Sequence, residues 1–234
     1  WQGGMVGGYG TADVLLGKTC PSGRLTDTIA YKITDYPSDA NFGNRDRDLY
    51  EEDIYVGYRY FETAAKERVR YPFGFGLSYT DFRTWDVSFS AGEKDAEITF
   101  TVQNIGTVPG KEVVQVYVTA PEGALSKPEK VLAGFAKTRE LKPGLKEQMR
   151  IAIPYESFAS YDETGASGFA SSYILEKGEY LFHIGRNVRE TEVAGSFTLE
   201  ETVCLASLSQ ALAPVTPFER MRFIREKDLS LIHI

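Results

Sequence analysis

Five carboxylic acids fall within eight residues of this chain and are its most obvious candidates for chemistry: Asp46, Asp48, Glu51, Glu52 and Asp53. A calcium loop would require alternating oxygen ligands, a glycine at the turn and a terminal Glu, and that pattern is absent. Because charge runs usually face water, we interpret the cluster as a solvated acidic loop that pairs with Arg45 and Arg47. A contribution from this loop to the outer part of a substrate cleft is the alternative.

Two further features suggest chemistry but are explained better by structure. His183 is out of phase with three large residues of its predicted strand, Tyr180, Phe182 and Ile184. It has no Ser, Cys or metal ligand at useful spacing, so we expect a structural or exposed role. The glycines from Gly3 to Gly10 lack the Lys-Ser/Thr ending and the preceding strand of a phosphate loop. We therefore expect no catalytic, cofactor-binding or metal-binding residue in this chain.

The composition is that of an ordinary globular protein. Of the 234 residues, 42% are hydrophobic and 25% are charged, which suits one large domain or two modest ones. The net charge of −7 argues against nucleic acid as a partner, because such partners need a basic surface. No run of about 18 apolar residues occurs, so we expect no membrane span. The oligomeric state stays open, as does the compartment, with the cytoplasm favoured.

Cys20 and Cys204 are the only cysteines. They lie in different predicted parts of the chain, and their spacing is not that of a metal site. We expect two reduced, inert thiols, and a disulfide between them is the alternative.

The periodicity of apolar residues divides the chain into two parts. Residues 1–83 mix short apolar runs with turn residues, and they predict a helix over 12–16, a strand over 25–31 and a loop over 34–44. From about residue 84 to residue 200, apolar and polar residues alternate in six or seven segments separated by turn residues. This pattern predicts an immunoglobulin-like sandwich whose sheets each have one buried and one wet face.

The last part of the sequence is expected to lie outside both domains. Residues 201–228 include the run Ala213-Pro214-Val215-Thr216-Pro217, which predicts a linker or extension. Residues 229–234, LSLIHI, correspond to one reading frame of a common sequencing adapter, and we interpret them as an artefact. Because Trp1 is no initiator, we also expect the chain to be a piece of a longer protein.

The most informative pattern lies between residues 50 and 82. Two aromatic blocks, YEEDIYVGYRYF and YPFGFGLSYTDF, flank a charged, helix-like spacer over 62–70. Each aromatic ring can bury on the order of 150–250 Å², and the glycines permit close backbone approach. We expect such a segment to pack between other elements.

Both blocks resemble the end of the catalytic module of glycoside hydrolase family 3, the β-glucosidase and β-xylosidase family. Its motifs ADVLxG and PSGRL also match, as ADVLLG at residues 12–17 and PSGRL at 21–25. The resemblance extends from Trp1 to about Leu199, and the departure at Thr26-Asp27 is interpreted as subfamily variation. It implies a mixed fold, in which residues 1–83 are the remnant of an α/β sandwich domain and residues 84–200 form a fibronectin type III-like β-sandwich.

The resemblance also implies a function. Such enzymes are retaining exo-β-glycosidases, which need two carboxyl groups about 5–5.5 Å apart and no cofactor. In the family, the nucleophile is an Asp of a barrel domain and the acid/base is a Glu earlier in the α/β domain; neither motif is present here. We therefore expect the scaffold part of a β-glucosidase that acts on β-linked oligosaccharides or aryl glucosides, inactive by itself. Because some members place the barrel after the sandwich, a linker at 201–228 would suit that order.

Two alternatives to the enzyme scaffold remain. A non-catalytic carbohydrate-binding or interaction module would act through exposed aromatics, for which the candidates are Tyr117, Tyr155, Tyr161 and Tyr173. A free-standing structural protein is disfavoured, because the aromatics of residues 50–82 would then lose partners and expose a large apolar patch.

Overall fold

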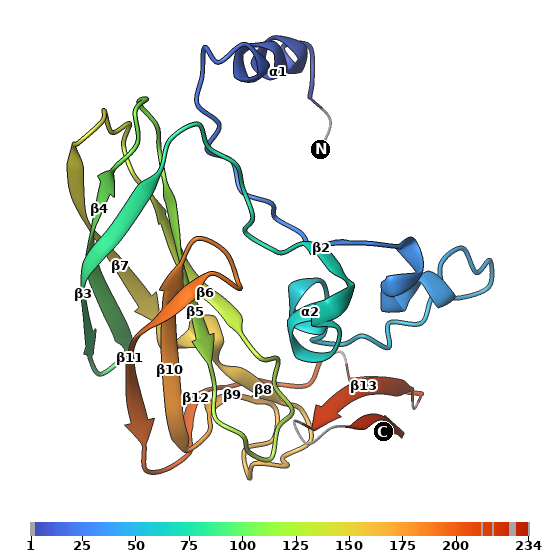
Figure 1. Ribbon diagram of the computed structural model, residues 1–234. Helices are drawn as coiled ribbons and strands as arrows, with labels where there is room; N and C mark the ends of the chain where they lie inside the picture. Colours follow the sequence, from blue (N-terminus) through green and yellow to red (C-terminus); the bar gives the residue numbers. More distant parts are fainter. Residues whose placement is uncertain (1–2, 212, 217, 225–227, 234) are drawn as a thin grey trace.

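The computed structural model describes residues 3–211, 213–216, 218–224 and 228–233. A β-sandwich occupies one side of the molecule, and the segment that precedes it runs along the other side (Figure 1). The mixed architecture expected from the sequence, a partial α/β part followed by an all-β sandwich, is confirmed.

The sandwich consists of two antiparallel sheets. One has the strand order β3-β4-β7, with bounds Phe82–Ala91, Asp95–Asn104 and Lys146–Pro154. The other has the order β11-β10-β5-β6, with bounds Thr191–Leu199, Gly178–Gly185, Val113–Thr119 and Val131–Lys137. Seven strands in two facing sheets agree with the immunoglobulin-like sandwich that the alternating pattern predicts.

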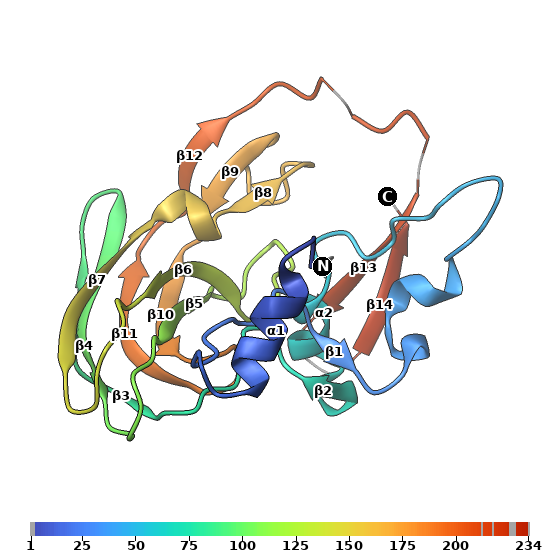
Figure 2. The ribbon, with the colours of Figure 1, turned by 90° about the horizontal axis from the view of Figure 1, so that it is seen from above.

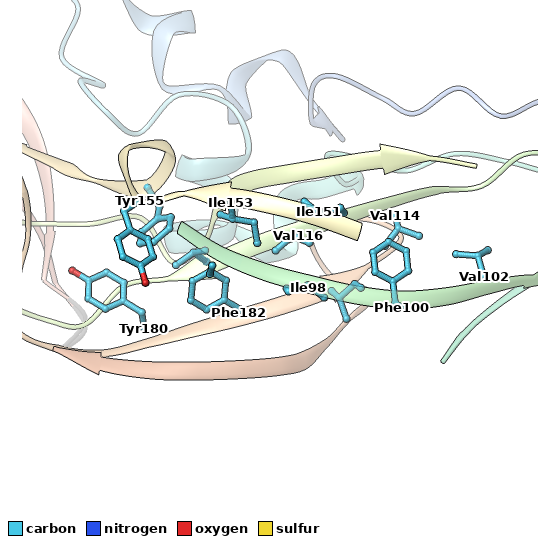
Figure 3. Close-up of a cluster of buried hydrophobic side chains, with 14 of the residues drawn as sticks. Ile98, Phe100, Val102, Val114, Val116, Ile151, Ile153, Tyr155, Tyr180 and Phe182 are labelled. Carbon is cyan, nitrogen blue, oxygen red and sulfur yellow. The ribbon is translucent and has the colours of Figure 1, made fainter. Parts of the chain in front are cut away.

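The inward-facing residues of the two sheets form the main core (Figure 3). Ile98 and Phe100 of β4 alternate with more polar neighbours, as do Val116 of β5 and Phe182 of β10, and all four are almost fully buried. At one end of this core Tyr180 and Phe197 stack with ring centroids 5.2 Å apart. Period-two alternation therefore correctly identifies the inner face of each sheet.

The outer face of β5 is not exposed to solvent, although the alternation of apolar and polar residues along this strand predicts that it is. Gln115 and Tyr117, which point away from the main core, are 3% and 0% exposed. The reason is a third layer: the aromatic segment that precedes β3 covers this face of the sheet. Its Tyr58 ring lies edge-on to Tyr117, with centroids 6.3 Å apart.

The part before the sandwich contains short elements only. They are the α-helices α1 (Gly7–Leu15) and α2 (Tyr58–Ala64), the paired strands β1 (Ile29–Ala30) and β2 (Val69–Tyr71), and 3-10 helices at Ile33–Asp35, Pro37–Ala40 and Lys66–Arg68. The predicted helix over 12–16 thus begins earlier, and the predicted strand over 25–31 shrinks to two residues. The predicted loop over 34–44 holds two 3-10 turns, since Asp35 accepts a hydrogen bond from the backbone of Lys32 and Pro37 starts the second turn. The helix-like spacer over 62–70 is the end of α2 followed by a 3-10 turn.

The chain after β11 is more ordered than the expected linker. A third small sheet has the order β12-β9-β8, with bounds Val203–Ser207, Ser172–Leu175 and Ser160–Asp162. Beyond it the chain crosses to the other side of the molecule, where β13 (Glu219–Ile224) pairs with β14 (Asp228–His233) (Figure 2). The stretch 201–228 therefore contributes strands at both of its ends. The hexapeptide 229–234 pairs through its backbone as far as His233, and its proposed origin as an artefact stays a prediction.

A second, smaller core joins this last segment to the first. Phe223 of β13 packs among buried residues of the N-terminal part: Ala30, Tyr55, Tyr60, Phe61, Ala65 and Val69. Among the described residues, no helix is both long enough and apolar enough to cross a lipid bilayer.

Candidate functional site

The acidic cluster does not form one site. Asp46 and Asp48 are exposed, whereas Glu51 and Glu52 are half-buried. The expected pairing with Arg45 and Arg47 is not found among the described residues. Asp53 instead lies 3.4 Å from a guanidinium nitrogen of Arg220, on a strand whose position the sequence did not indicate. None of the described acids, cysteines or histidines gathers into a group that could hold a metal ion.

His183 and the cysteines take part in local contacts. The Nε2 atom of His183 lies 3.0 Å from Thr119 Oγ1. Burial, with a smaller contribution from Lys130, lowers the pKa of His183 to about 4, against the opposing effect of Glu129. Cys20 and Cys204 are both free, so the alternative of a disulfide between them is wrong.

A buried carboxylate joins the N-terminal part to the sandwich. Glu112, just before β5, is 1% exposed and forms ion pairs with Arg24 and Arg186, the second at 3.1 Å. Its Oε1 also accepts the backbone N–H of Val113 at 2.7 Å. Arg24 belongs to the PSGRL motif and Arg186 follows β10, so this one carboxylate holds three separate segments together.

A second ion pair ties α2 to the same sheet. Glu62, 4% exposed, accepts the Nε–H of Arg189 at 2.9 and 3.1 Å on its two oxygens. On the next turn the Tyr58 hydroxyl accepts the backbone N–H of Leu132 at 2.9 Å. Glu62 and Tyr58 of α2 therefore bind residues of the sandwich. Because Glu62 is the acid of this helix and is paired, α2 provides no unpaired carboxylate for chemistry.

A cleft of about 470 Å³ is lined by residues of β8, β9, the loop 124–128 and β13; strands β8, β9 and β13 lie in the lower part of Figure 1. We call it the β8–β13 cleft. Its cationic residues are Arg59, Lys127, Arg220 and Arg222, and its carboxylates are Asp53, Asp162 and Glu163. Its volume falls within the usual range of small-molecule sites, roughly 300–1,000 Å³.

The carboxylates of the β8–β13 cleft are held in ways that do not suit acid or base catalysis. Arg220 pairs with both Asp53 and Glu163. Burial would raise the pKa of Asp162, but hydrogen bonds from Ser167, Gly165 and Ala166 outweigh it and lower that pKa below its ordinary value. A general acid needs a raised pKa, so Asp162 does not suit that role.

The four candidate aromatics separate into two pairs. Tyr117 and Tyr155 are buried in the protein, which removes them as binding residues. Tyr161 of β8 and Tyr173 of β9 are directly paired across the strands, half-exposed, and both line the β8–β13 cleft. Sequence reasoning named these two tyrosines but missed Arg220, which lies in the expected linker and carries no motif that would have indicated it.

Each of the two parts of the chain matches a known protein family model. The family model described as Glycosyl hydrolase family 3 C-terminal domain matches residues 1–79, and the one described as Fibronectin type III-like domain matches residues 112–188. Residues 1–79 therefore belong to the C-terminal domain of glycosyl hydrolase family 3. The motif resemblance is thus confirmed, and this family 3 chain carries the two domains in the order that the motifs indicated.

Individual relatives of the family 3 chain are β-glucosidases. It is 53% identical over 223 residues to a β-glucosidase of Ruminococcus albus, covering 94% of this chain and 23% of that protein. It is 46% identical to β-glucosidase A of Butyrivibrio fibrisolvens, and the match covers 94% of this chain and 29% of that protein. The chain therefore spans about a quarter of the length of these curated relatives.

Solved structures agree with the assignment. A β-glucosidase from Paenibacillus barengoltzii superposes with a TM-score of 0.93 at 43% identity, covering 100% of this chain and 27% of that one. β-Glucosidase 3B from Thermotoga neapolitana, solved in complex with glucose, superposes with a TM-score of 0.79 at 37% identity. The superposition covers 87% of this chain and 28% of the Thermotoga chain. The fold described above is thus a known part of larger family 3 proteins.

Proposed function

We propose that this chain is the scaffold part of a retaining exo-β-glucosidase that removes terminal β-D-glucosyl residues from oligosaccharides or aryl glucosides. The observation that carries the proposal is its 53% identity, over almost its whole length, to a β-glucosidase. The double displacement requires a nucleophilic carboxylate and a carboxylic acid about 5–5.5 Å apart. In this proposal both come from parts of the enzyme that this chain does not contain.

The surface of the N-terminal part supports a scaffold role. Large apolar side chains stay exposed on α1 and on the segments before and after it, including Met5, Tyr9, Leu15, Tyr31, Phe42 and Tyr50. A monomeric soluble protein rarely leaves so many apolar residues uncovered in one region. In the proposed enzyme the remainder of the α/β domain covers them, while Glu112 and α2 fix that domain to the sandwich.

A chimera tests the proposal. The matching segment of the Ruminococcus albus β-glucosidase is replaced by this chain, and hydrolysis of an aryl β-glucoside is measured beside the parent enzyme. We expect the chimera to keep kcat/KM within about tenfold of the parent, because a scaffold changes transition-state contacts little. Deleting the segment from the parent should abolish activity.

Two outcomes would contradict the proposal. One is a chimera that is monodisperse and folded by circular dichroism yet hydrolyses no aryl glucoside, since the chain would then not serve as this scaffold. The other is turnover by the purified 234-residue chain alone above a heat-killed control, since the chain would then contain a catalytic pair of its own.

A further inference from the structure

We infer that the β8–β13 cleft is a non-catalytic binding site for a neutral pyranose, such as the end of a β-linked gluco-oligosaccharide. The inference goes beyond hydrolysis, because the cleft is built by side chains of this chain alone and requires no catalytic pair. It rests on three features of the cleft: an aromatic platform, a set of paired polar groups and a near balance of charge.

Tyr161 and Tyr173 form the platform. They face each other directly across β8 and β9, with ring centroids 5.2 Å apart and planes inclined by 54°. The two side chains are 40% and 42% exposed, so both rings present apolar surface to the cleft. A pyranose whose hydroxyls are equatorial has two flat C–H faces, and an aromatic surface with a polar tip suits such a ligand.

Arg220 provides the polar side of the cleft. It reaches from β13 to Glu163 beside the platform and to Asp53 of the N-terminal part. Ionised carboxylates have about four acceptor positions and the guanidinium has five donors, so these groups keep capacity after pairing. Adjacent sugar hydroxyls, each both donor and acceptor, match such an arginine–carboxylate arrangement.

Two donors near the platform have no partner. The Nε–H groups of Arg220 and Arg222 are buried and donate to no acceptor among the described residues. Buried donors are normally paired. A ligand hydroxyl, or a water that the ligand orders, would satisfy them.

The charges favour a neutral ligand over an anion. Lys127 is neutralised by the buried Glu176, and Arg220 is shared by two carboxylates. Four cationic and three acidic side chains line the cleft in all. A phosphate site would instead carry a clear excess of arginine and lysine over carboxylates.

The walls of the cleft are fixed before any ligand arrives. Glu176 accepts the backbone N–H groups of Ala124 and Leu125 at 2.7 and 3.3 Å. Asp162 accepts those of Gly165 and Ser167 at 2.8 and 2.7 Å. Both loops that border the platform are therefore held from within, and a preorganised site loses less entropy on binding.

Calorimetric titration of the full 234-residue chain with cellotriose tests the site. We expect saturable binding with a dissociation constant of ~1 mM, as for a small site with few anchors. Tyr161→Ala and Tyr173→Ala should each weaken it at least about tenfold, whereas Tyr161→Phe should stay within about threefold because it keeps the ring. Tyr31 is exposed and does not line the cleft, so Tyr31→Ala is the matched control and should change binding less than about twofold.

Several results would overturn the inference. They are no saturable heat with cellotriose up to about 20 mM, equal weakening by Tyr31→Ala, or undiminished binding in both cleft variants. Binding of inorganic phosphate without cellotriose would show an anion site instead. Near-UV circular dichroism and the urea midpoint establish that each variant is folded. If the alanine variants are not, Tyr161→Leu takes their place, because it keeps an apolar side chain but removes the ring; undiminished binding in that variant would overturn the inference. Because hydrolysis is not the readout, an inactive chimera would leave this result unaffected.

Discussion

The side-chain amide of Gln115 donates to the carbonyl oxygen of Gly74 at 3.2 Å and to that of Arg186 at 2.7 Å. Its Oε1 accepts the hydroxyl of Tyr117 at 2.5 Å. A glutamine on the outer face of the central sheet thus uses its amide to hold the second aromatic block. The contact joins the α/β part to the sandwich through the backbone of a glycine.

Replacing that glycine should weaken the junction. In Gly74→Ala the new Cβ would overlap the Gln115 side chain, at a backbone φ of +81° that L-residues rarely adopt. Unfavourable φ costs about 1–2 kcal/mol and overpacking about 1–3 kcal/mol, so we expect a loss of about 2–4 kcal/mol in unfolding free energy by urea denaturation. Gly144→Ala is the matched control, since it has the same φ and no atom within 4 Å. Equal losses in both variants would show that the Gln115 contact is unimportant.

Glu112→Gln should be among the most destabilising single substitutions in the chain. It removes the charge that Arg24 and Arg186 share, and leaves the mostly buried Arg24 guanidinium uncompensated. Breaking a buried ion pair costs about 3–5 kcal/mol, which chemical denaturation would measure. Glu97→Gln breaks an exposed pair with Arg150 and should cost no more than about 1 kcal/mol. If the two variants lost the same free energy, Glu112 would not act as the link between domains.

His183 should make the protein less stable in mild acid. Burial lowers its pKa from 6.5 to about 4 in the folded state. Between these values the unfolded chain binds more protons than the folded one, so this contribution is complete above pH 6.5 and is lost as the pH falls toward 4. The slope from one such group is at most about 1.4 kcal/mol per pH unit.

Urea unfolding at pH 7, 5.5 and 4.5 would measure this dependence. His183→Gln should flatten this dependence. An unchanged slope in the variant would show that groups other than His183 cause the acid sensitivity.

Limited proteolysis should distinguish the two parts of the chain. None of the side chains of α1 is buried, and Tyr9, Leu15 and Leu16 are highly exposed. Segments with few buried contacts open at low free energy, so chymotrypsin should cut within residues 3–18 well before it cuts within 84–199. Mass spectrometry of the early products would identify the sites. Equal resistance of the two regions would mean that the N-terminal part is self-sufficient.

The sequence predicted the sandwich well because a half-buried strand has a period of two that survives in a single sequence. Ile98, Phe100 and Val102 of β4 alternate with polar neighbours and point into the core. The same logic failed for Gln115 and Tyr117 of β5, because alternation cannot show that a third layer covers the outer face. Only the density of aromatics in residues 50–82 indicated such a layer.

The β8–β13 cleft was only half predictable. Tyr161 and Tyr173 were candidates from their residue type, but their pairing depends on the register of two strands with three and four residues. Arg220 could not be foreseen, since its segment joins the site through tertiary contacts with residues distant in sequence. The Pro-rich composition around residue 215 correctly indicated irregular chain but not the strand that follows it.

The position of Phe223 in the sequence affects the order in which the protein can fold while it is being synthesised. Its ring lies 4.5 Å from that of Tyr55, and its carbonyl accepts the hydroxyl of Ser126 at 2.7 Å. Tyr55 leaves the ribosome first, Ser126 next and Phe223 only after the whole sandwich has emerged. Chains fold as they are made, N-terminal parts first, but here the aromatic core around Tyr55 must wait for Phe223 to close it. A nascent chain that stalls anywhere between residues 201 and 222 would therefore carry a finished sandwich beside an open first domain.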